Sequence, residues 1–547
     1  MKFDDMGVLF DELAAAGGDT LVHLDRPFDL DGDRPATTEW TMPGLARLVA
    51  QTAAALAAAG AGPGDRVAIV KANHWDYDLI ACAAVRIGAV PVKLSGELSA
   101  TALRTLLDRC APRLLVTDLA LLDRTRADGL TADDGLTTAA RTTVVLDRDG
   151  ELPPGVVRLD DLRGHPAPGP HRRHDDTPLV VVHTSGTTGV PKLVCHTTRT
   201  LVHQLARFET LPLPRLGVRR GDSLFNASAY AHGRTFCWTA VAPVLGPRHI
   251  SISTGDHPER ADLLLRAHPP TVVEALPARY VRLRPLTRRL DHPFRDVRTY
   301  ISTYDAVHPP VIRAFLDASA RRGALWMQGW GQSETGPLTF AFHTRRSLVR
   351  GAGPGGGAVK DAVTVRDLGR PVPFKTRLKA VDPDTFRPVP PGVPGLILCR
   401  TRAVAPDYLG ESGRWAAKRH GDWWNTGDIG EITRDGRVLL LDREVDHSPA
   451  LSCLRTEDIL EERLATALEC LVLARPDDRP FPVVVTEDGT LDPEEWKRAV
   501  HDLPDLADPA VLTWERVPRT GTGKVRRTAL LEQLTGRADT CGTGRWT

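Results

Sequence analysis

The stretch that decides the fold runs from Leu179 to Lys192 and reads LVVVHTSGTTGVPK. Its first residues are apolar and β-branched, which is typical of a buried strand. Small hydroxyl residues and glycines follow, and Pro191 and Lys192 close the segment. Glycines let the backbone turn sharply, so that successive N–H groups can face one point, and the hydroxyl groups and the lysine add donors there. The order of residues therefore predicts a cradle for phosphate oxygens rather than an ordinary polar loop.

The pattern of this loop is not that of a Walker loop, because it contains no Gly-Lys-Ser or Gly-Lys-Thr triplet. It resembles the signature T-S-G-T-T-G-x-P-K of the adenylate-forming superfamily, which includes acyl-CoA and aryl-CoA synthetases, adenylation domains of peptide synthetases, and luciferases. Residues 184–192 match this signature residue for residue. The resemblance implies that Lys192 is catalytic and that the loop binds the nucleotide. The implied nucleotide-binding residues of the loop are Thr184, Ser185, Gly186, Thr187, Thr188 and Gly189.

Length, charge and cysteine usage bound the class of protein. A chain of 547 residues is too long for one core and implies several subdomains. The formal net charge of +1 gives no bulk attraction to nucleic acid or to an acidic membrane surface. The eight cysteines include no C-x-x-C pair, which fits a reducing cytosol. No signal peptide is visible. The apolar region 45–59 is interrupted by Arg47 and Gln51, which argues against a membrane span. We therefore expect a cytoplasmic protein with neither nucleic acid nor membrane as a partner.

Predicted strands and helices alternate along the chain, which indicates an α/β domain. The expected strands are 66–70, 114–118, 143–146, 179–182, 271–277 and 299–303, together with 223–233 as a strand that ends in a loop. The expected helices are 39–60, 80–87 and 198–209, and a small α+β region follows with a helix at 457–468 and strands at 471–474 and 483–486. The resemblance implies a large N-terminal domain of two α/β subdomains plus a small β-barrel, residues 1–441. A mobile, small α+β C-terminal domain, residues 442–547, is expected to follow.

A second motif extends the resemblance to the centre of the chain. Residues 328–335 read QGWGQSET and resemble the superfamily pattern Y-G-x-T-E. The match implies that Trp330 stacks on adenine and that Ser333 binds the α-phosphate. Glu334 is implied to be catalytic and to hold Mg²⁺, a hard cation that prefers carboxylate oxygens and water. A turn of Gly, Ser and Glu is usually structural, but its spacing from the phosphate loop favours the functional interpretation.

Two further motifs complete the implied nucleotide site. Residues 423–430 read WWNTGDIG and resemble W-x-x-T-G-D-x-G. The match implies that Asp428 accepts hydrogen bonds from both ribose hydroxyls. Arg443 falls where the superfamily makes a second contact to ribose or phosphate. Residues 517–527 resemble P-x-T-x-x-G-K-x-x-R and place Lys524 in a loop flanked by glycine. A positive charge there pairs with the α-phosphate and with the attacking carboxylate, so Lys524 is expected to be catalytic.

The substrate side of the implied site matches only in part. A His-Gly loop borders the carboxylate pocket in relatives that activate acyl or aryl acids, and His232 and Gly233 are its expected counterparts. Arg234 is either a partner of the substrate carboxylate or an ordinary surface arginine. The glycine-rich element that relatives place against adenine reads STYDA here, so Tyr304 is expected to narrow the substrate tunnel or to reposition the base. His171 and His174 could hold a metal, but without a third histidine nearby a solvated loop is favoured.

The implied reaction joins two anions. Attack of a carboxylate on the α-phosphate of ATP makes an acyl-AMP and pyrophosphate, and Mg²⁺, Lys192 and Lys524 would bring the reactants together. The acyl group then usually passes to coenzyme A or to the phosphopantetheine thiol of an acyl carrier protein after the small domain rotates. At the expected hinge, Val445 replaces a polar residue, and residues 448–454 contain neither glycine nor lysine. This divergence bears on the thiol-transfer step rather than on adenylation.

Three hypotheses remain open. The favoured one is an ATP-dependent ligase that activates a small-molecule acyl or aryl acid and transfers it to a thiol. The second is an adenylating enzyme with another acceptor or with an unusual acid such as nitrite, as in related diazo-forming enzymes, and the divergent hinge supports it. The third is a non-catalytic nucleotide-binding homologue, against which the presence of Lys192, Glu334, Asp428 and Lys524 argues.

Overall fold

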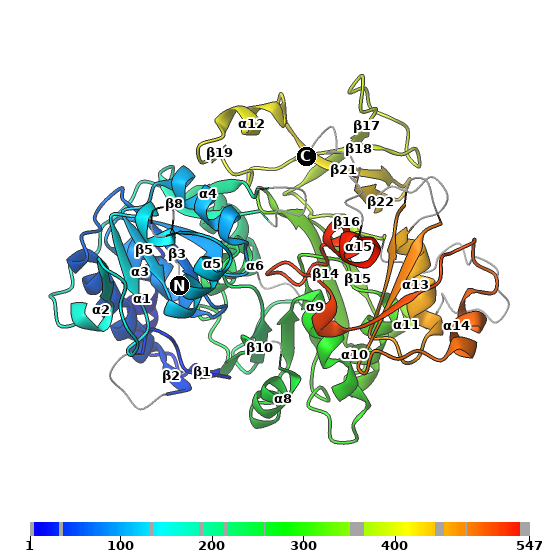
Figure 1. Ribbon diagram of the computed structural model, residues 1–547, viewed down its shortest axis with the longest axis horizontal. Helices are drawn as coiled ribbons and strands as arrows, with labels where there is room; N and C mark the ends of the chain where they lie inside the picture. The colour runs from blue at the N-terminus through cyan, green and yellow to red at the C-terminus, as the bar shows by residue number, and fades with distance from the viewer. Residues whose placement is uncertain are drawn as a thin grey trace. The chain divides into compact units, whose positions relative to one another are not determined.

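The computed structural model of the chain is shown in Figure 1. It describes residues 5–31, 37–131, 133, 135–184, 190–211, 216–255, 257–349, 366–443, 453–475 and 479–536. The chain forms two compact units. Unit 1 comprises Met1–Glu274, Ser333–Gly336 and Arg402–Ala417, and unit 2 comprises Ala275–Gln332, Pro337–Thr401 and Lys418–Thr547. These two units differ from the two domains expected from the sequence, which meet between residues 441 and 442. The expected boundary marks the start of a mobile domain and stays a prediction.

The first sheet of unit 1 has eight strands in the order β19-β9-β8-β4-β3-β5-β6-β7. The six strands from β8 to β7 in this order are parallel neighbours, whereas β9 and β19 join antiparallel to them. The strands are β3 (Arg66–Lys71), β4 (Val90–Ser95), β5 (Leu114–Thr117), β6 (Thr142–Val145), β7 (Val156–Arg158), β8 (Pro178–His183), β9 (Leu193–Thr197) and β19 (Asp407–Tyr408). Parallel strands buried on both faces explain the continuous apolar runs in the sequence.

Helices alternate with these strands, as the sequence predicts, and one further helix follows the last strand. They are α2 (Met42–Ala58), α3 (Asp76–Arg86), α4 (Ala100–Cys110), α5 (Leu119–Ala127) and α12 (Ser412–Ala417), with 3₁₀ turns η1 (Leu136–Ala139) and η2 (Asp160–Leu162). Ser99 and Asp118 cap α4 and α5, because each side chain accepts a hydrogen bond from the backbone N–H three residues on. Apolar side chains of α4 and α5 pack on those of β3, β4, β5 and β8 and form one buried cluster.

The second sheet of unit 1 orders its strands β12-β10-β11-β1-β2. They are β1 (Leu21–Leu24), β2 (Glu39–Thr41), β10 (Ser223–Ala227), β11 (His249–Ile252) and β12 (Val272–Ala275). The helices of this part are α1 (Leu9–Ala15), the π-helix η3 (Arg199–Ala206), α6 (Arg207–Glu209), α7 (Gly233–Thr239) and α8 (Pro258–Ala267). The strand predicted at 223–233 ends at Ala227, and residues 228–232 lead from it into α7, as the predicted loop requires.

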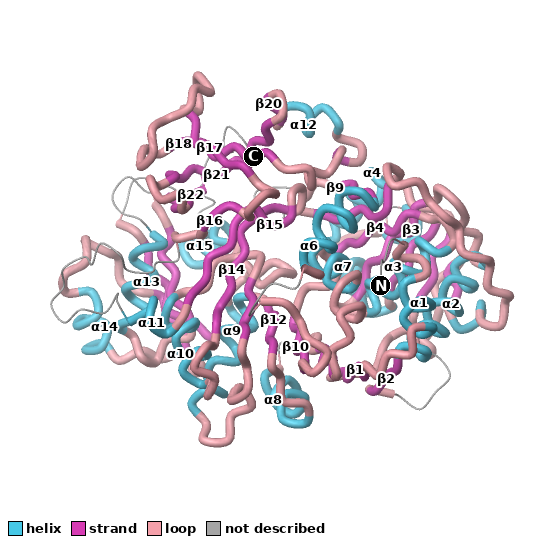
Figure 2. Tube along the Cα trace, turned by 180° about the vertical axis from the view of Figure 1, so that it is seen from behind, coloured by secondary structure: helices cyan, strands magenta, loops and turns pink. Residues whose placement is uncertain are grey.

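Unit 2 contains a sheet with the order β16-β15-β14-β13, in which β13 and β14 are parallel and β15 and β16 are antiparallel. Strands β14, β15 and β16 are labelled in Figure 2. Its strands are β13 (Thr299–Ser302), β14 (Leu325–Gln332), β15 (Gly336–His343) and β16 (Arg370–Pro371). Its helices are α9 (Pro277–Leu283), η4 (Arg284–Arg288), α10 (Pro309–Ala318) and α11 (Arg345–Val349). The buried rings of Tyr280, Tyr300, Phe315 and Trp326 pack together between these elements.

Two smaller sheets complete unit 2. A five-stranded antiparallel sheet contains β17 (Arg377–Val381), β18 (Gly395–Arg400), β20 (Arg419–His420), β21 (Trp423–Ile432) and β22 (Val438–Arg443). The last sheet contains β23 (Glu469–Leu473), β24 (Phe481–Thr486) and β25 (Ala510–Thr513). The remaining helices are α13 (Cys453–Arg463), α14 (Pro493–Val500), η5 (Trp514–Arg516) and α15 (Arg527–Thr535). The helix predicted at 457–468 thus begins earlier and ends earlier than expected.

Two other predictions of local structure need correction or fall outside the structure. Residues 123–176, for which the sequence predicts only the strand 143–146, also contain the end of α5, the 3₁₀ turns η1 and η2, and β7. Strand β7 pairs with β6 at an edge of the sheet, and its three residues alternate too briefly to produce a periodic signal. The divergent hinge at Val445 and most of residues 448–454 lie outside the described residues. Within the described residues, no helix is long and apolar enough to cross a membrane.

A cluster of ionisable side chains joins α10 to α13 within unit 2. Nδ1 of His308, at the start of α10, lies 2.7 Å from a carboxylate oxygen of Asp458, and its Nε2 lies 3.8 Å from Oε1 of Glu461. Burial alone would lower the pKa of His308, but the charges of Glu461 and Asp458 raise it to about 10. Burial also raises the pKa of Glu461 to about 7, so its charge is present above that pH.

The raised pKa of His308 predicts a loss of stability at alkaline pH. A group whose pKa rises on folding stabilises the folded state in full below its unfolded value of 6.5, and this contribution is lost as the pH approaches about 10. We therefore expect His308→Gln to reduce the free energy of unfolding by about 1.5–3 kcal/mol near neutral pH, and by progressively less up to pH 10. Denaturant unfolding across this window measures the effect. His501→Gln, at an exposed site of unit 2, is the control, and a pH-independent gap would contradict the assignment.

Candidate active site

The neck of the predicted phosphate loop is a closed hairpin in unit 1. Strands β8 and β9 pair antiparallel, with His183 opposite Leu193. The N–H of Thr184 donates to the carbonyl of Lys192 at 3.0 Å, and the N–H of Lys192 donates to the hydroxyl of Thr184 at 3.1 Å. The strand predicted before the loop is confirmed. The two ends of the loop, Thr184 and Lys192, are held next to each other. Ser185, Gly186, Thr187, Thr188 and Gly189 lie outside the described residues.

A buried histidine supports the first residue of this loop. The N–H of Ser95 lies 3.1 Å from Nε2 of His183, and Nδ1 of His183 lies 2.7 Å from the carbonyl oxygen of Thr184. Burial lowers the pKa of His183 to about 4, so the ring is neutral at pH 7. Because the amide can only donate to Nε2, the ring proton is on Nδ1 and is donated to Thr184. The imidazole therefore links β4 to the beginning of the phosphate loop.

The predicted substrate loop lies against the same histidine. His232 and His183 have ring centroids 4.7 Å apart. Nζ of Lys93, which is buried and paired with Asp78, donates to the carbonyl of His232 at 3.2 Å. Gly233 begins α7, where an added Cβ would lie 3.4 Å from the side chain of Val182. The structure thus brings His232 and Gly233 to the base of the phosphate loop, and adds His183 and Lys93, which the sequence analysis missed.

Neither expectation for Arg234 describes its surroundings. Its side chain is mostly buried, so it is not an ordinary surface arginine. The guanidinium donates to both carboxylate oxygens of Glu274, at 2.8 and 2.9 Å, and to Glu209 at 2.5 Å. Two protein carboxylates therefore already occupy the positions that a substrate carboxylate would need. Arg234 acts in the structure as a link between α7, β12 and α6.

Three side chains from distant parts of the sequence meet beside the phosphate loop. The hydroxyl of Tyr408 donates to Oε1 of Glu334 at 2.5 Å, and Nζ of Lys192 lies 5.7 Å from the centre of the Tyr408 ring. Tyr408 is on β19, which pairs with β9 directly after Lys192. The N–H of Ala405 donates to the carbonyl of Glu334 at 2.7 Å. Segments near 192, 334 and 408 therefore form one arrangement in unit 1, which the sequence predicted for Lys192 and Glu334 but not for Tyr408.

The protonation states of this arrangement are defined by burial. Burial raises the pKa of Tyr408, and the charge of Glu334 raises it further, so the phenol keeps its proton and donates it. The Glu334 carboxylate is buried, and among the described residues its Oε2 has no hydrogen-bond partner. One oxygen fixed by Tyr408 and one available oxygen fit the hard, oxygen-preferring Mg²⁺ ion that the motif implies. The neighbouring carbonyl of Ser333 accepts a hydrogen bond from Nε2 of His196 at 2.7 Å.

A second group of predicted residues lies in unit 2, around Asp428 on β21. Gln332, at the end of β14, donates to the carbonyl of Thr426 at 2.5 Å and lies 3.4 Å from Oδ2 of Asp428. The indole N–H of Trp424 donates to Oε1 of the same glutamine at 3.2 Å. The contacts with Thr426 and Trp424 therefore fix the orientation of the Gln332 amide. This amide in turn holds the buried Asp428 carboxylate. The sequence analysis did not single out Gln332, although it lies within the motif that contains Trp330.

The other predicted nucleotide contacts of unit 2 are placed less completely. Trp330 lies two residues before Gln332 on β14 and is half-buried. Arg443 is opposite Asp428 in the antiparallel pairing of β21 with β22, as a shared site would require. The side chain of Arg443 is outside the described part of the structure. The roles of both residues stay predictions.

Tyr304 has a backbone conformation typical of glycine, which the resemblance places at this position. Its φ angle is +80°, in the left-handed region that glycine adopts freely and that other residues adopt only at a cost of about 1–3 kcal/mol. The glycine expected from the resemblance at this position explains the conformation. Thr303 follows β13 directly and precedes Tyr304, and a Cβ added at Gly329 of β14 would lie 3.4 Å from the Thr303 side chain. The chain thus keeps a glycine backbone and adds a large aromatic side chain.

Lys524 lies on a tight turn that packs on α9. The N–H of Thr520 donates to the carbonyl of Lys524 at 2.8 Å, and the N–H of Lys524 donates to the Thr520 hydroxyl at 3.2 Å. Gly523 has a φ of +78°, and a Cβ there would lie 2.5 Å from that of Ala278. Only glycine therefore allows this loop to approach the helix so closely. The turn predicted around Lys524 is present, and its catalytic role stays a prediction.

The contact between Tyr408 and Glu334 predicts a specific defect in magnesium use. Tyr408→Phe removes one hydrogen bond to a charged carboxylate, which contributes about 1.5–3 kcal/mol. We expect the Mg²⁺ concentration that supports half-maximal ATP-dependent pyrophosphate release to rise about tenfold. Tyr300→Phe is a matched control, because Tyr300 is equally buried and its hydroxyl has no hydrogen-bond partner among the described residues. Superimposable Mg²⁺ curves for Tyr408→Phe and wild type would show that Tyr408 does not position a metal ligand.

Comparison with known proteins assigns these features to a group of enzymes. Residues 23–409 match the family described as AMP-binding enzyme. The chain is 35% identical to the 3-amino-2-hydroxy-4-methoxybenzoate diazotase of Streptomyces cremeus, over 98% of this chain and 97% of the relative. It is 26% identical to the 3-aminoavenalumate diazotase of a Streptomyces species, over 82% of this chain and 76% of the relative.

Solved structures show the same fold. A crystal structure of an anthranilate CoA ligase in complex with anthranoyl-AMP has a TM-score of 0.76 and 19% identity, and 97% of each chain is covered. This likeness confirms the expected fold class, with a large α/β N-terminal domain, a small β-barrel-like sheet and a small α+β C-terminal domain.

Proposed function

The chain belongs to the AMP-binding enzyme family, and we propose that it uses ATP to activate nitrite and transfers the nitrosyl group to an aromatic amine. The observation that carries this proposal is the 35% identity to a diazotase of an aminohydroxybenzoate over nearly the full length of both chains. A second relative is also a diazotase, and both enzymes are named for amino-substituted acids. We therefore favour nitrite activation over the acid–thiol ligase reaction.

The proposed reaction has two group-transfer steps, adenylation and nitrosyl transfer, and then a loss of water. An oxygen of nitrite attacks the α-phosphorus of ATP, the bond to the pyrophosphate oxygen breaks, and nitrosyl-AMP and pyrophosphate form. The amine lone pair then attacks the nitrosyl nitrogen, the N–O bond to AMP breaks, and the amine loses one proton to give an N-nitrosamine. This product takes up a proton and loses water, which leaves the aryl diazonium ion. No thiol takes part in either step.

Adenylation places demands on charge that the predicted residues meet. Nitrite and ATP are both anions, so cations must offset their repulsion at the point of attack. We propose that Lys192 and the loop 184–189 hold phosphate oxygens and that Glu334 holds Mg²⁺. Bound Mg²⁺ would neutralise phosphate charge and polarise the phosphoryl group. Lys524 would stabilise the charge that develops at the α-phosphate.

The remaining nucleotide contacts follow the motifs. Asp428, whose carboxylate Gln332 orients, would accept hydrogen bonds from the ribose hydroxyls. Trp330 would stack on the adenine, Ser333 would bind the α-phosphate, and Arg443 would add a contact to ribose or phosphate. On the substrate side, we propose that His232 and Gly233 border the site of the acid group.

Two features of the chain favour a small acid without a thiol acceptor. Tyr304 combines a left-handed backbone conformation with a bulky ring, and we propose that this ring narrows the substrate tunnel. Nitrite has only three atoms and needs less room than an acyl chain. Val445 stands where the resemblance places the hinge of the thiol-transfer state, and we propose that this β-branched residue restricts the backbone change that a hinge must absorb. Nitrosyl transfer to an amine does not require a thiol to enter.

The second candidate function is an acid–thiol ligase, and one observation favours it. The chain has the complete set of motif residues that would adenylate a carboxylate: Lys192, Glu334, Asp428 and Lys524. In this case an aryl acid would replace nitrite, and coenzyme A or the phosphopantetheine thiol of a carrier protein would accept the acyl group. Fast decay of a preformed adenylate on addition of coenzyme A would support this candidate.

The proposal predicts nitrite-dependent release of pyrophosphate. With ATP, Mg²⁺ and an aminohydroxybenzoate, nitrite should start pyrophosphate and AMP formation, and coenzyme A should not change the rate. Lys524→Ala should lower the rate by about 10²–10³-fold and leave ATP affinity nearly unchanged, because one donor that stabilises transition-state charge is lost. Lys497→Ala is the matched control, since this lysine is in the same C-terminal segment, exposed and paired only with Glu494 in the structure.

The experiment separates the hypotheses by its acid dependence. Pyrophosphate release that requires a carboxylic acid, ignores nitrite and yields a thioester with coenzyme A would overturn the nitrite proposal in favour of the ligase. Release with neither acid, together with normal ATP binding, would instead support a non-catalytic nucleotide-binding protein.

A further inference from the structure

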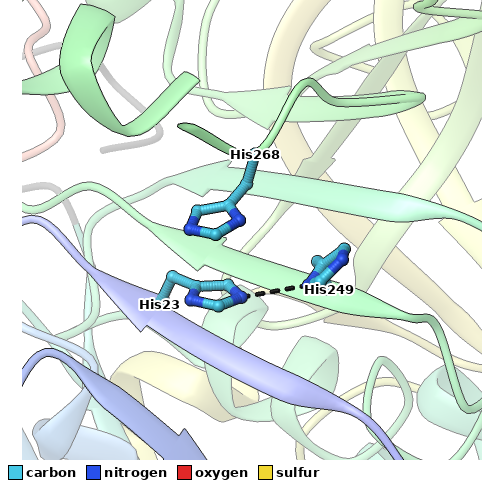
Figure 3. A group of neighbouring side chains, drawn as sticks. All are labelled: His23, His249 and His268. Carbon is cyan, nitrogen blue, oxygen red and sulfur yellow. Dashed lines mark hydrogen bonds between the residues drawn. The ribbon is translucent and has the colours of Figure 1, made fainter. Parts of the chain in front are cut away.

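Three histidines from separate segments gather on one face of the second sheet of unit 1 (Figure 3). His23 is on β1, His249 begins β11, and His268 directly follows α8. Strands β1 and β11 are parallel neighbours, in which His23 lies opposite Ser251. Because side chains two residues apart share a face, His249 is on the same face as Ser251 and therefore as His23. The end of α8 brings the third imidazole over this pair.

The ring nitrogens are close enough to share one ion. Nε2 of His23 lies 3.0 Å from Nδ1 of His249, and one nitrogen from each of the three rings falls within 4.8 Å of the others. Two ligand nitrogens around a tetrahedral zinc ion are roughly 3.3 Å apart, given Zn–N bonds of about 2.0–2.1 Å. The first pair thus already has the spacing of two ligands. His268 is half-buried at the end of a helix, and its ring is stacked on that of His23 with centroids 3.5 Å apart, so a shared ion requires a change of the His268 rotamer.

A carboxylate lies where it can orient the most buried of the three rings. Glu39 of β2 is directly opposite His23 in the antiparallel pairing of β1 and β2. Its Oε2 lies 3.4 Å from Nδ1 of His23, while Nε2 of the same ring faces His249. Metal-binding histidines usually present their second nitrogen to a carboxylate or carbonyl, which fixes the tautomer and leaves the other nitrogen as the ligand. The two nitrogens of His23 are divided in this way.

The electrostatic surroundings keep the imidazoles in the form that binds metals. Burial lowers the pKa of His23 to about 4, and the charges of His268 and His249 act in the same direction. Burial also lowers the pKa of His249, with contributions from His268 and Arg248, and it lowers that of His268 against the opposing charge of Glu39. Neutral imidazole is the ligand form of histidine.

We propose that His23, His249 and His268 bind one divalent transition-metal ion that prefers imidazole ligands, with Zn²⁺ as the expected ion. The nitrogen ligands distinguish this site from the oxygen-ligated Mg²⁺ proposed at Glu334. Three protein ligands leave a fourth position for water or another donor. Because the ligands come from β1, β11 and the end of α8, bound metal would fasten these three elements together. The proposal does not depend on which acid the enzyme activates.

The test is metal binding by the whole chain after treatment with a chelator and removal of any affinity tag. Titration with Co²⁺ should give the visible absorption of a nitrogen-ligated tetrahedral ion that saturates at one equivalent, and Zn²⁺ should displace it. His268→Asn, at a half-buried site outside the strands, should abolish the saturable signal. Glu39→Gln should keep the stoichiometry and weaken Zn²⁺ binding about 10–100-fold, the usual effect of losing an outer partner.

Two controls keep the result interpretable. His174→Ala removes an exposed histidine elsewhere in unit 1 and should bind Co²⁺ like the wild type. The melting temperature of the wild type should rise on addition of Zn²⁺, because the ion binds the folded state, whereas that of His268→Asn should not. No saturable Co²⁺ signal in the wild type, or an equal signal in His268→Asn, would overturn the proposal and leave a hydrogen-bonded histidine cluster.

Discussion

The hydrogen bond from Tyr408 to Glu334 is the contact on which the arrangement of the candidate site depends. Residues 333–336 and 402–417 belong to unit 1, although the chain between them belongs to unit 2. The chain therefore returns to unit 1 twice, once to supply Glu334 and once to supply Tyr408. Strand β19 joins β9 directly after Lys192, so the second return also fixes the end of the phosphate loop. Since a buried carboxylate without a partner is costly, this single contact couples the two returns energetically.

Burial controls the charges around this contact. His183 stays neutral below the phosphate loop because burial lowers its pKa, and it can therefore hold Thr184 without adding a charge. Lys93 pairs with Asp78 and donates to the carbonyl of His232. Arg234 pairs with Glu274 and Glu209. The cations that the motifs assign to the reacting anions are Lys192 and Lys524, two of only ten lysines in the chain. The supporting charges are thus satisfied within the protein, and the motif lysines are assigned to the nucleotide.

The sequence predicted the elements whose signals are local, and it missed those that depend on tertiary contacts. The strand before the phosphate loop and the turn around Lys524 follow from apolar runs and glycine positions, and both are present. Tyr408 and Gln332 were missed because their partners Glu334 and Asp428 are far away in sequence, and the motif that contains Gln332 does not reveal its partner. The histidine cluster was missed for the same reason: three separate histidines carry no spacing signal until β1 and β11 pair. Arg234 was misjudged because its partner Glu274 is forty residues away.

The central claim is that nitrite, and not a carboxylate, is the acid that attacks ATP. The most direct measurement follows the oxygen atom, because the attacking oxygen stays on the phosphorus when the amine displaces AMP. Turnover with ¹⁸O-labelled nitrite, unlabelled ATP and an unlabelled aminohydroxybenzoate should give AMP that carries one ¹⁸O atom, as measured by mass spectrometry. Unlabelled AMP from this mixture, and ¹⁸O-labelled AMP when the label is placed in the carboxylate, would contradict the account and identify the carboxylate as the nucleophile.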